Sequence, residues 1–254
     1  MSRSNKLDRR AVARALLDGR DENLLVVTGL GSTTYDAFAA GDHDLNFYLW
    51  GAMGGAAIMG LGIALAQPKK QVLVITGDGE MLMGLGALAT IGVQQPANLS
   101  VIAFDNAHYG ETGMQASHTG KGVDLVGVAK ACGIPDCRDV NDMDGVAELK
   151  TRIRAGGSTL FARVGISAEE TPRALPTRDG VEILRPCVDA ILERTDYRHF
   201  ELLILDNQSR CPEALAYMEA VARRDPRVRV LRWDHPFNYS AINNFGAAHA
   251  RGEL

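Results

Sequence analysis

Two kinds of apolar pattern alternate along the first two-thirds of the chain. Short runs rich in β-branched residues, such as 72–75 and 99–104, predict buried strands, and residues 82–95 between them carry apolar positions at helical spacing. This order predicts a three-layer α/β fold, in which helices cover both faces of a parallel sheet. Other strands are expected at 24–28 and 159–164, a short extended segment at 46–50, and other helices at 5–17, 54–67, 124–132 and 143–155.

The last third of the chain predicts a second, partial α/β unit. A polar stretch with two prolines, residues 167–180, precedes it and is typical of a linker. Glycine also becomes rare, since 25 of the 27 glycines lie at or before Gly180. We therefore expect two domains, residues 1–171 and 172–254. The helices of the second are expected at 181–194 and 212–223, and its strands at 200–206 and 228–231.

Composition and charge exclude several functional classes. The chain has 254 residues, of which 46% are hydrophobic, and its net charge of −4 provides no basic surface for nucleic acid. No apolar run reaches the length that spans a membrane, and the polar N-terminus is unlike a signal peptide. The four cysteines form no Cys-x-x-Cys pair, which favours reduced thiols. We expect a cytoplasmic protein with no nucleic-acid or membrane partner.

Two oxygen-bearing side chains follow neighbouring predicted strands. Asp78, within Gly77-Asp78-Gly79-Glu80, follows the first strand, and Asn106 follows the second. The carboxyl ends of parallel strands form the edge at which open α/β sheets bind ligands. Carboxylate and amide oxygens suit Mg²⁺, which also binds phosphate oxygens, and the glycines let the backbone approach a diphosphate closely. The alternative is a turn after a strand and an ordinary strand-end asparagine.

This arrangement resembles the Gly-Asp-Gly…Asn signature of thiamine-diphosphate enzymes. The resemblance implies a thiamine-diphosphate-binding fold in which Asp78, Asn106 and the main-chain carbonyl of His108 hold Mg²⁺ on the diphosphate of the cofactor. The candidate cofactor contacts at this edge are Gly77, Gly79 and Glu80, with residues 30–34 after the first strand.

A second motif, Trp50-Gly51-Ala52-Met53-Gly54, resembles the element that supports the bent cofactor in thiamine-diphosphate decarboxylases. By this resemblance Met53 props the bend, and the Gly51 carbonyl accepts a hydrogen bond from the 4′-amino group of the cofactor. An unbranched thioether fills such an irregular space well. The alternative is that Met53 is an ordinary core residue at a turn between a strand and a helix.

The polar, glycine-rich residues 108–119 predict an active-site loop. The loop is similar to that of phosphonopyruvate and sulfopyruvate decarboxylases, especially their small β-type subunit, and the similarity covers residues 5 to about 178. Glu111 lies one position before the catalytic glutamate of pyruvate-decarboxylase-type enzymes, so the resemblance does not carry that role to it. His118 can exchange protons near neutral pH. The candidates here are Glu111 and His118 for catalysis and Tyr109 and Gly110 for cofactor binding, and the alternative is that each is a solvated loop residue.

The resemblance implies a subunit of a 2-oxo-acid decarboxylase that binds thiamine diphosphate and Mg²⁺. The reaction would be non-oxidative decarboxylation of a small-molecule 2-oxo acid through the cofactor ylid. Such enzymes need a glutamate on a pyrimidine-binding domain, and the chain contains no such domain. We therefore expect an oligomer with a separate pyrimidine-binding α-type subunit. The alternative of a non-catalytic thiamine-diphosphate-binding subunit stays open.

Residues from about 172 onward look like the first part of a family 2 glycosyltransferase. In that family the aspartate at the end of a strand contacts a nucleotide-sugar, and Asp206 is the matching residue. The sequence reaches Leu254 before any Asp-x-Asp metal motif. We expect a truncated, non-catalytic segment, with a glycosyltransferase-related nucleotide-sugar-binding protein as the alternative function.

Overall fold

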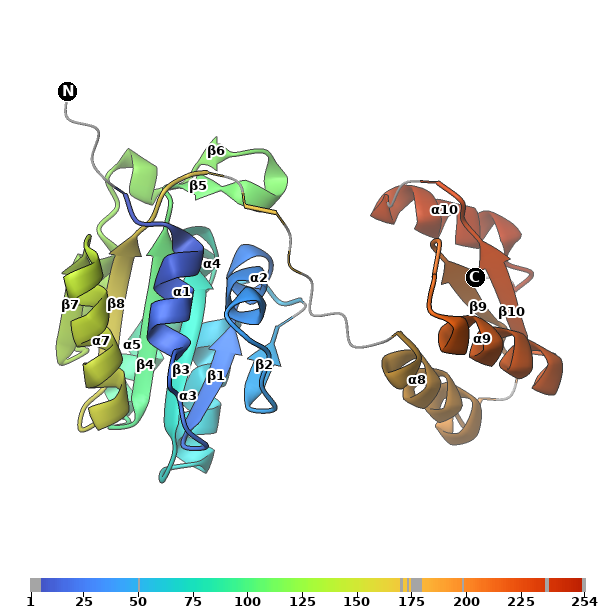
Figure 1. The fold of residues 1–254 in the computed structure, drawn as a ribbon, viewed down its shortest axis with the longest axis horizontal. Coiled ribbons are helices and arrows are strands. Elements are labelled where there is room, and N and C mark those ends of the chain that lie inside the picture. The colour runs from blue at the N-terminus through green and yellow to red at the C-terminus, as the bar shows by residue number, and fades with distance from the viewer. Residues whose placement is uncertain are drawn as a thin grey trace. The chain divides into compact units, whose positions relative to one another are not determined.

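Six strands form a parallel sheet at the centre of the first unit, Met1–Pro176 (Figure 1). Every strand pairs in parallel with its neighbours, in the order β2-β1-β3-β4-β8-β7. The central strands β3 and β4 are buried along almost their whole length. The strands are β1 (Leu24–Thr28), β2 (Asn46–Tyr48), β3 (Gln71–Gly77), β4 (Leu99–Asp105), β7 (Asp136–Val140) and β8 (Leu160–Gly165).

This computed structural model describes residues 6–49, 51–169, 171–172, 174, 180–197, 199–235 and 238–252. The chain divides into two units, Met1–Pro176 and Thr177–Leu254, and each is considered by itself. The domain boundary expected after residue 171 lies a few residues before this division and stays a prediction.

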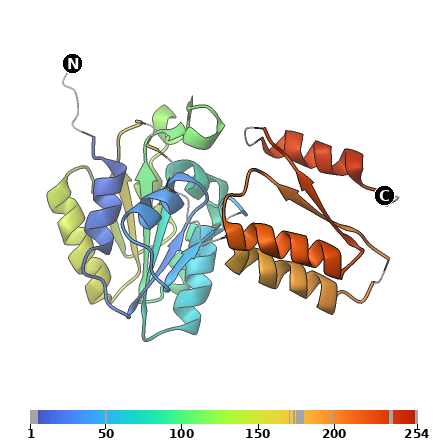
Figure 2. The same cartoon turned by 45° about the vertical axis from the view of Figure 1, so that its right-hand side comes forward.

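Helices cover both faces of the sheet (Figures 1 and 2). Successive residues of a strand point to opposite faces of the sheet. Leu73 and Ile75 belong to one apolar cluster, and Val72 and Val74 belong to the other. The predicted three-layer fold is therefore confirmed. One layer contains α1 (Arg9–Leu17), α2 (Ser32–Ala39) and α7 (Met143–Ala155), and the other contains α3 (Ala56–Ala66), α4 (Asp78–Met83), α5 (Gly86–Gln94) and α6 (Leu125–Ala131).

Aspartate residues define where three of these helices begin. The side chains of Asp8, Asp124 and Asp142 accept hydrogen bonds from backbone N–H groups at the starts of α1, α6 and α7. Each such cap contributes about 1 kcal/mol to helix stability. These caps hold the helix ends at defined positions around the sheet.

Three elements differ from the sequence prediction. The single helix expected at 82–95 is two helices, α4 and α5, which meet at Gly84 and Leu85. The chain breaks there because the Gly54 carbonyl packs where a side chain at Gly84 would stand. Helix α2 and the edge strand β7 were not predicted, since β7 is short and charged and lacks an apolar run.

A hairpin and two short 3₁₀ turns follow β4 at the carboxyl edge of the sheet. Strands β5 (His108–Tyr109) and β6 (Gln115–Ala116) pair antiparallel. The turns cover Gly110–Thr112 and Thr119–Lys121. The predicted active-site loop is thus an ordered hairpin.

The second unit contains a two-stranded parallel sheet with helices. Its apolar cluster includes Val188, Leu192, Tyr217 and Val221. The four predicted elements are present, and α10 is additional. The elements are α8 (Gly180–Arg194), β9 (Leu202–Asp206), α9 (Pro212–Arg224), β10 (Val228–Arg232) and α10 (Tyr239–His249). Across the described residues of both units, no helix combines the length and apolarity needed to cross a lipid bilayer.

Candidate active site

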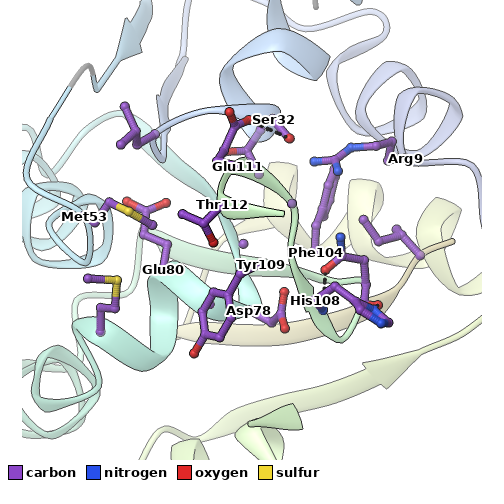
Figure 3. Close-up of a pocket in the computed structure, with 18 residues that line it drawn as sticks. Arg9, Ser32, Met53, Asp78, Glu80, Phe104, His108, Tyr109, Glu111 and Thr112 are labelled. Carbon is purple, nitrogen blue, oxygen red and sulfur yellow. Dashed lines mark hydrogen bonds between the residues drawn. The ribbon is translucent and has the colours of Figure 1, made fainter. Parts of the chain in front are cut away.

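The carboxyl edge of the sheet contains a cavity of about 240 Å³ (Figure 3). Strand β3 ends at Gly77, which pairs with Phe104 near the end of β4. Asp78 and Asn106, which follow these strands, therefore lie at the same edge, as predicted. The cavity is lined by Arg9, Leu30, Ser32, Thr33, Met53, Gly77, Asp78, Gly79, Glu80, Met83, Phe104, Asn106, His108, Tyr109, Gly110, Glu111, Thr112 and Ile166.

The predicted site residues of the first unit line this cavity, except Gly51, His118 and, within residues 30–34, Gly31 and Thr34. His118 is one hydrogen bond away, because its Nδ1 lies 2.9 Å from the Tyr109 hydroxyl. Gly51 belongs to the turn that carries Met53 but does not line the cavity. The cavity thus brings together residues from six separate stretches of sequence, 9, 30–33, 53, 77–83, 104–112 and 166. The functions assigned to them remain predictions.

Asp78 is a buried carboxylate held by two hydroxyl groups. It is 2% exposed, and its Oδ2 accepts hydrogen bonds from Ser117 Oγ at 2.5 Å and Thr119 Oγ1 at 2.9 Å. Burial raises the pKa of Asp78, the hydrogen bond from Ser117 opposes this shift, and the charge of Asp105 adds to it. A cation beside this carboxylate would favour its ionised form.

Asp105, which sequence reasoning missed, supports this arrangement from β4. Thr119 Oγ1 also lies 2.7 Å from Asp105 Oδ1, so its single proton can serve only one of the two carboxylates. Arg163 Nε donates to Asp105 Oδ2 at 2.7 Å. Burial alone raises the pKa of Asp105, but the hydrogen bonds from Arg163 and Thr119 and the charge of Arg163 outweigh it and hold the pKa below its usual range.

Asn106 and His108 form a turn whose oxygens remain suited to a hard cation. Asn106 Oδ1 accepts from the His108 backbone N–H at 2.9 Å, and His108 Nδ1 lies 2.8 Å from the Asn106 carbonyl oxygen. Since a carbonyl only accepts, Nδ1 is assigned the proton. The imidazole is thus tied to the backbone, which agrees with the expectation that His108 contributes its carbonyl rather than its ring.

The set of available donors fits Mg²⁺. Carboxylate, amide and main-chain carbonyl oxygens are the ligands this ion prefers, together with phosphate oxygens. Among the residues that the structure describes, no group of three or more His, Cys, Asp or Glu side chains is placed to hold a metal. A metal at this edge would therefore depend on Asn106 and main-chain oxygens in addition to Asp78.

Glu80 has a buried side-chain oxygen that lacks a hydrogen-bond partner among the described residues. It is 4% exposed, and its Oε2 accepts from Thr76 Oγ1 at 2.9 Å. Its Oε1 is buried and has no hydrogen-bond partner in the described part of the chain. Burial raises the pKa of Glu80, against the effect of the Thr76 hydrogen bond. Buried polar atoms are usually satisfied, so an oxygen without a partner on a residue that lines the cavity fits a site that binds a polar ligand.

Met53 lies on the wall of the cavity and is 40% exposed, so the alternative of an ordinary core residue is wrong. The turn that carries it packs closely on the α4–α5 break. A Cβ atom at Gly84 would lie 2.0 Å from the Gly54 carbonyl oxygen. Met83, also exposed, is another residue that lines the cavity.

Tyr109 packs over the glycine that follows Asp78. A Cβ atom at Gly79 would lie 2.5 Å from Cε1 of the Tyr109 ring. The ring therefore needs a glycine at this position. Glu111 lies further along the hairpin, where its Oε1 accepts from Ser32 Oγ at 3.1 Å. Figure 3 shows Glu111 beside Ser32, on the side of the cavity formed by the start of α2.

Residues 29–162 match the family described as thiamine pyrophosphate enzyme, C-terminal TPP binding domain. The chain belongs to this family. The predicted family and the predicted cofactor, thiamine diphosphate with its typical ion Mg²⁺, are thereby confirmed. The cavity is formed by the matched residues and their immediate neighbours in the fold, Arg9 and Ile166.

Several curated relatives are decarboxylases or their subunits. Sulfopyruvate decarboxylase subunit beta of Methanocaldococcus jannaschii is 40% identical over 123 residues, covering 48% of this chain and 65% of the relative. The same subunit of Methanothermobacter thermautotrophicus is 37% identical over 175 residues, covering 69% and 91%. Phosphonopyruvate decarboxylase of Streptomyces viridochromogenes is 38% identical over 151 residues, covering 59% and 38%.

A solved structure supports the fold. A thiamine diphosphate-dependent 4-hydroxybenzoylformate decarboxylase of Rhodococcus jostii has a TM-score of 0.55 and 20% identity, and the match covers 67% of this chain and 34% of that one. The chain thus spans about a third of this enzyme and little more than a third of the S. viridochromogenes relative. Residues 174–254 match the family described as glycosyl transferase family 2, in agreement with the predicted resemblance.

Proposed function

We propose that this chain is the thiamine-diphosphate- and Mg²⁺-binding subunit of a decarboxylase that acts on 2-oxo acids of the sulfopyruvate or phosphonopyruvate type. The observation that carries the proposal is the cavity at the carboxyl edge of β3 and β4. There the buried Asp78 carboxylate, the Asn106 amide and the backbone at His108 meet the orphaned Oε1 of Glu80.

Asp78, Asn106 and the His108 carbonyl would hold Mg²⁺ on the diphosphate. Gly77, Gly79, Tyr109 and Gly110 would line the diphosphate and its linker, and the absence of a Cβ atom at Gly77 and Gly110 would permit close approach. Hydroxyl groups of Ser117 and Thr119 orient the Asp78 carboxylate. Such supporting hydrogen bonds keep a metal ligand in its binding geometry.

Met53 would support the bent cofactor from the cavity wall, with the Gly51 carbonyl nearby in the same turn. When bound, thiamine diphosphate supplies the nucleophilic carbon and the electron sink that loss of CO₂ from a 2-oxo acid requires. The apolar wall made by Met53, Met83 and Phe104 would exclude water from that carbon.

His118 and Tyr109 would move protons at the cavity. The Tyr109 hydroxyl is hydrogen bonded to His118 Nδ1, which leaves Nε2 of the exposed imidazole to exchange a proton with solvent. Glu111, at the opposite side of the hairpin, is a second candidate acid or base.

The site would be completed by a pyrimidine-binding α-type subunit, so the functional protein would be an oligomer. The side chains of Met53 and Met83 are exposed beside the cavity, and Ile58 and Leu65 are exposed on α3. Exposed apolar side chains beside an open site, here Met53 and Met83, favour cover by a partner. Two relatives described above are themselves beta subunits. The four cysteines are free thiols, which suits a cytoplasmic location.

The second unit favours an alternative, binding of a nucleotide-sugar. Asp206 is buried at the end of β9, and its Oδ1 accepts from the Ser209 backbone N–H at 2.9 Å. A titration with nucleotide-sugars tests this alternative on the full chain. Absence of binding would remove it.

Reconstitution tests the main proposal. The full chain should be mixed with the α-type subunit of a sulfopyruvate decarboxylase, thiamine diphosphate and Mg²⁺, and CO₂ release from sulfopyruvate and phosphonopyruvate should be followed. We expect turnover that is lost in Asp78→Ala. Cofactor binding without turnover of either acid would instead support a non-catalytic subunit, and absence of both would contradict the proposal.

A further inference from the structure

We propose that Arg9 is a cofactor-binding residue whose guanidinium group binds the terminal phosphate of the diphosphate. This inference rests on the proposed function and concerns how the cavity balances the charge of its ligand. Arg9 belongs to none of the motifs by which the site is identified in the sequence.

The N-terminal segment places Arg9 at the carboxyl edge of the sheet. Leu7 forms a parallel bridge with Ile166 just beyond β8, and the Ser167 backbone N–H donates to the Leu7 carbonyl at 2.8 Å. Helix α1 begins two residues after Leu7, at Arg9 itself. Arg9 therefore lines the same cavity as Asn106 and Ser32, and with them a smaller adjoining polar pocket.

One nitrogen of the Arg9 guanidinium group is hydrogen bonded within the protein, and the two terminal nitrogens are available to a ligand. Arg9 Nε donates to Asp36 Oδ2 at 2.6 Å, and the Arg9 side chain is only 10% exposed. In the part of the chain that the structure describes, neither terminal nitrogen of Arg9 donates a hydrogen bond. Figure 3 shows the group reaching from α1 toward the interior of the cavity. A guanidinium end that lines a cavity and donates to no acceptor points to an anionic ligand.

Arg9 supplies the positive charge at this end of the cavity, and the acidic side chains of Glu111 and Glu169 share the adjoining pocket with it. Asp36 is fully buried and faces two guanidinium groups, because Arg10 Nε lies 3.8 Å from Asp36 Oδ1. Of the described residues that line the cavity, Arg9 is the only lysine or arginine. Asp78, Glu80 and Glu111 line the same cavity, so its other charged side chains are acidic.

The charge of a diphosphate explains why such a cation is needed. Its two phosphates together carry roughly two and a half to three negative charges near neutral pH. One Mg²⁺ balances two of these charges, and the acidic side chains add more. The planar guanidinium group can donate two parallel hydrogen bonds to a phosphate. Because its Nε is already bonded to Asp36, the Arg9 side chain loses little conformational freedom on binding.

Binding of Mg²⁺–pyrophosphate to the full chain tests the inference, since this probe reports the diphosphate end of the site without catalysis. Calorimetry should show roughly ten- to one-hundred-fold weaker binding in Arg9→Gln than in the parent, the effect of losing charge-assisted hydrogen bonds. Arg10→Gln is the matched control, because Arg10 also faces Asp36 but does not line the cavity, and we expect its affinity to stay within about threefold.

Asp36 loses its close partner in Arg9→Gln, so folding must be checked by thermal melting. If Arg9→Gln does not fold, the double variant Arg9→Gln/Asp36→Asn removes the unpaired buried carboxylate and gives the same test. Equal pyrophosphate affinity in a folded Arg9 variant and the parent overturns the assignment of Arg9 but leaves the proposed function intact. Equal weakening in Arg10→Gln also overturns it, as a general charge effect.

Two further outcomes distinguish failure of the inference about Arg9 from failure of the proposed function. Unchanged pyrophosphate affinity with weaker binding of sulfopyruvate would transfer Arg9 from the cofactor to the substrate and overturn the inference. A parent chain that binds neither Mg²⁺–pyrophosphate nor Mg²⁺–thiamine diphosphate would overturn both the inference and the proposed function.

Discussion

At the scale of single residues, the site depends on how its buried carboxylates are balanced. Asp78 and Asp105 share the Thr119 hydroxyl, yet the pKa of Asp78 is raised and that of Asp105 is lowered. The difference arises because Arg163 pairs with Asp105 and not with Asp78. Asp105 is therefore a structural anion, and Asp78 is the carboxylate left for a cation.

Asp78→Asn should abolish Mg²⁺-dependent cofactor binding while leaving the fold intact. Asparagine can still accept from Ser117 and Thr119, and it removes a buried carboxylate whose ionisation is unfavourable without metal. We expect calorimetry to show at least about 100-fold weaker binding of Mg²⁺–thiamine diphosphate. The control is Asp144→Asn, in the exposed first turn of α7. Parent-like affinity in Asp78→Asn would remove Asp78 from the metal site.

Arg163→Met should destabilise the protein by about 3 kcal/mol at pH 7, because it leaves Asp105 buried without its cation. The folded-state pKa of Asp105 is lowered, so its contribution to stability is present above the unfolded-state pKa of about 4 and is lost as the pH falls through the folded-state value. The difference between variant and parent should therefore shrink below about pH 4.

Urea unfolding of parent and variant at several pH values measures this difference. Arg138→Met is a matched control with an expected loss below about 1 kcal/mol, because its partner Asp136 is also paired with Arg152. A constant difference across the pH range would show that the Arg163 effect does not pass through Asp105.

At the scale of elements, glycines determine how the turns around the cavity meet. The Met53 turn packs on the α4–α5 break, where the Gly54 carbonyl occupies the place of a side chain at Gly84. Tyr109 of the β5–β6 hairpin packs in the same way on Gly79. These close contacts at Gly79 and Gly84, rather than helix propensity, determine where α4 begins and ends.

Gly84→Ala should therefore cost about 1–3 kcal/mol of stability, since its Cβ would lie 2.0 Å from a backbone oxygen that must shift. The shift displaces the Met53 turn, so cofactor affinity should fall as well. Gly86→Ala is the matched control, because no atom lies within 4 Å of its Cβ position, and alanine at the start of α5 should be neutral or slightly stabilising. Thermal melts and cofactor titrations measure both effects, and equal behaviour of the two variants would contradict this account.

At the scale of the whole molecule, the two units differ in how completely they bury their strands. In the first unit the strands of a six-stranded sheet pack between two apolar clusters. In the second unit β9 and β10 form a two-stranded sheet whose residues are mostly half-buried. Two-stranded sheets depend on their packing against helices for stability.

Hydrogen exchange should accordingly be faster in the second unit. We expect backbone amides of β9 and β10 to exchange earlier than those of β3 and β4, because their opening costs less free energy. Mass spectrometry of peptides from the full chain measures both sets together. Equal protection in the two units would contradict the expected difference in stability.

Removal of residues 177–254 should leave cofactor binding unchanged, since every residue that lines the cavity belongs to the first unit. The shortened chain should bind Mg²⁺–thiamine diphosphate with the affinity of the full chain, measured by calorimetry. Decarboxylation with the α-type subunit should also persist. Loss of either property in a shortened chain that remains folded would reveal a function for the second unit.

The sequence by itself determined most of the parallel sheet and its helices, and the edge at which Asp78 and Asn106 meet. Apolar runs such as those of β3 and β4 are local signals, and the residues that follow parallel strands must meet at one edge. Asp78, Asn106 and Met53 could be found for that reason, because each stands at a junction that the local pattern marks.

Only the tertiary structure decided which distant residues complete the site. Arg9 enters the cavity because Leu7 pairs beside β8, and Thr119 reaches Asp78 because the β5–β6 hairpin folds back. The break between α4 and α5 depends on the Gly54 carbonyl, far away in sequence. Such contacts leave no local periodicity, since they arise from the packing of segments that are independent in the sequence.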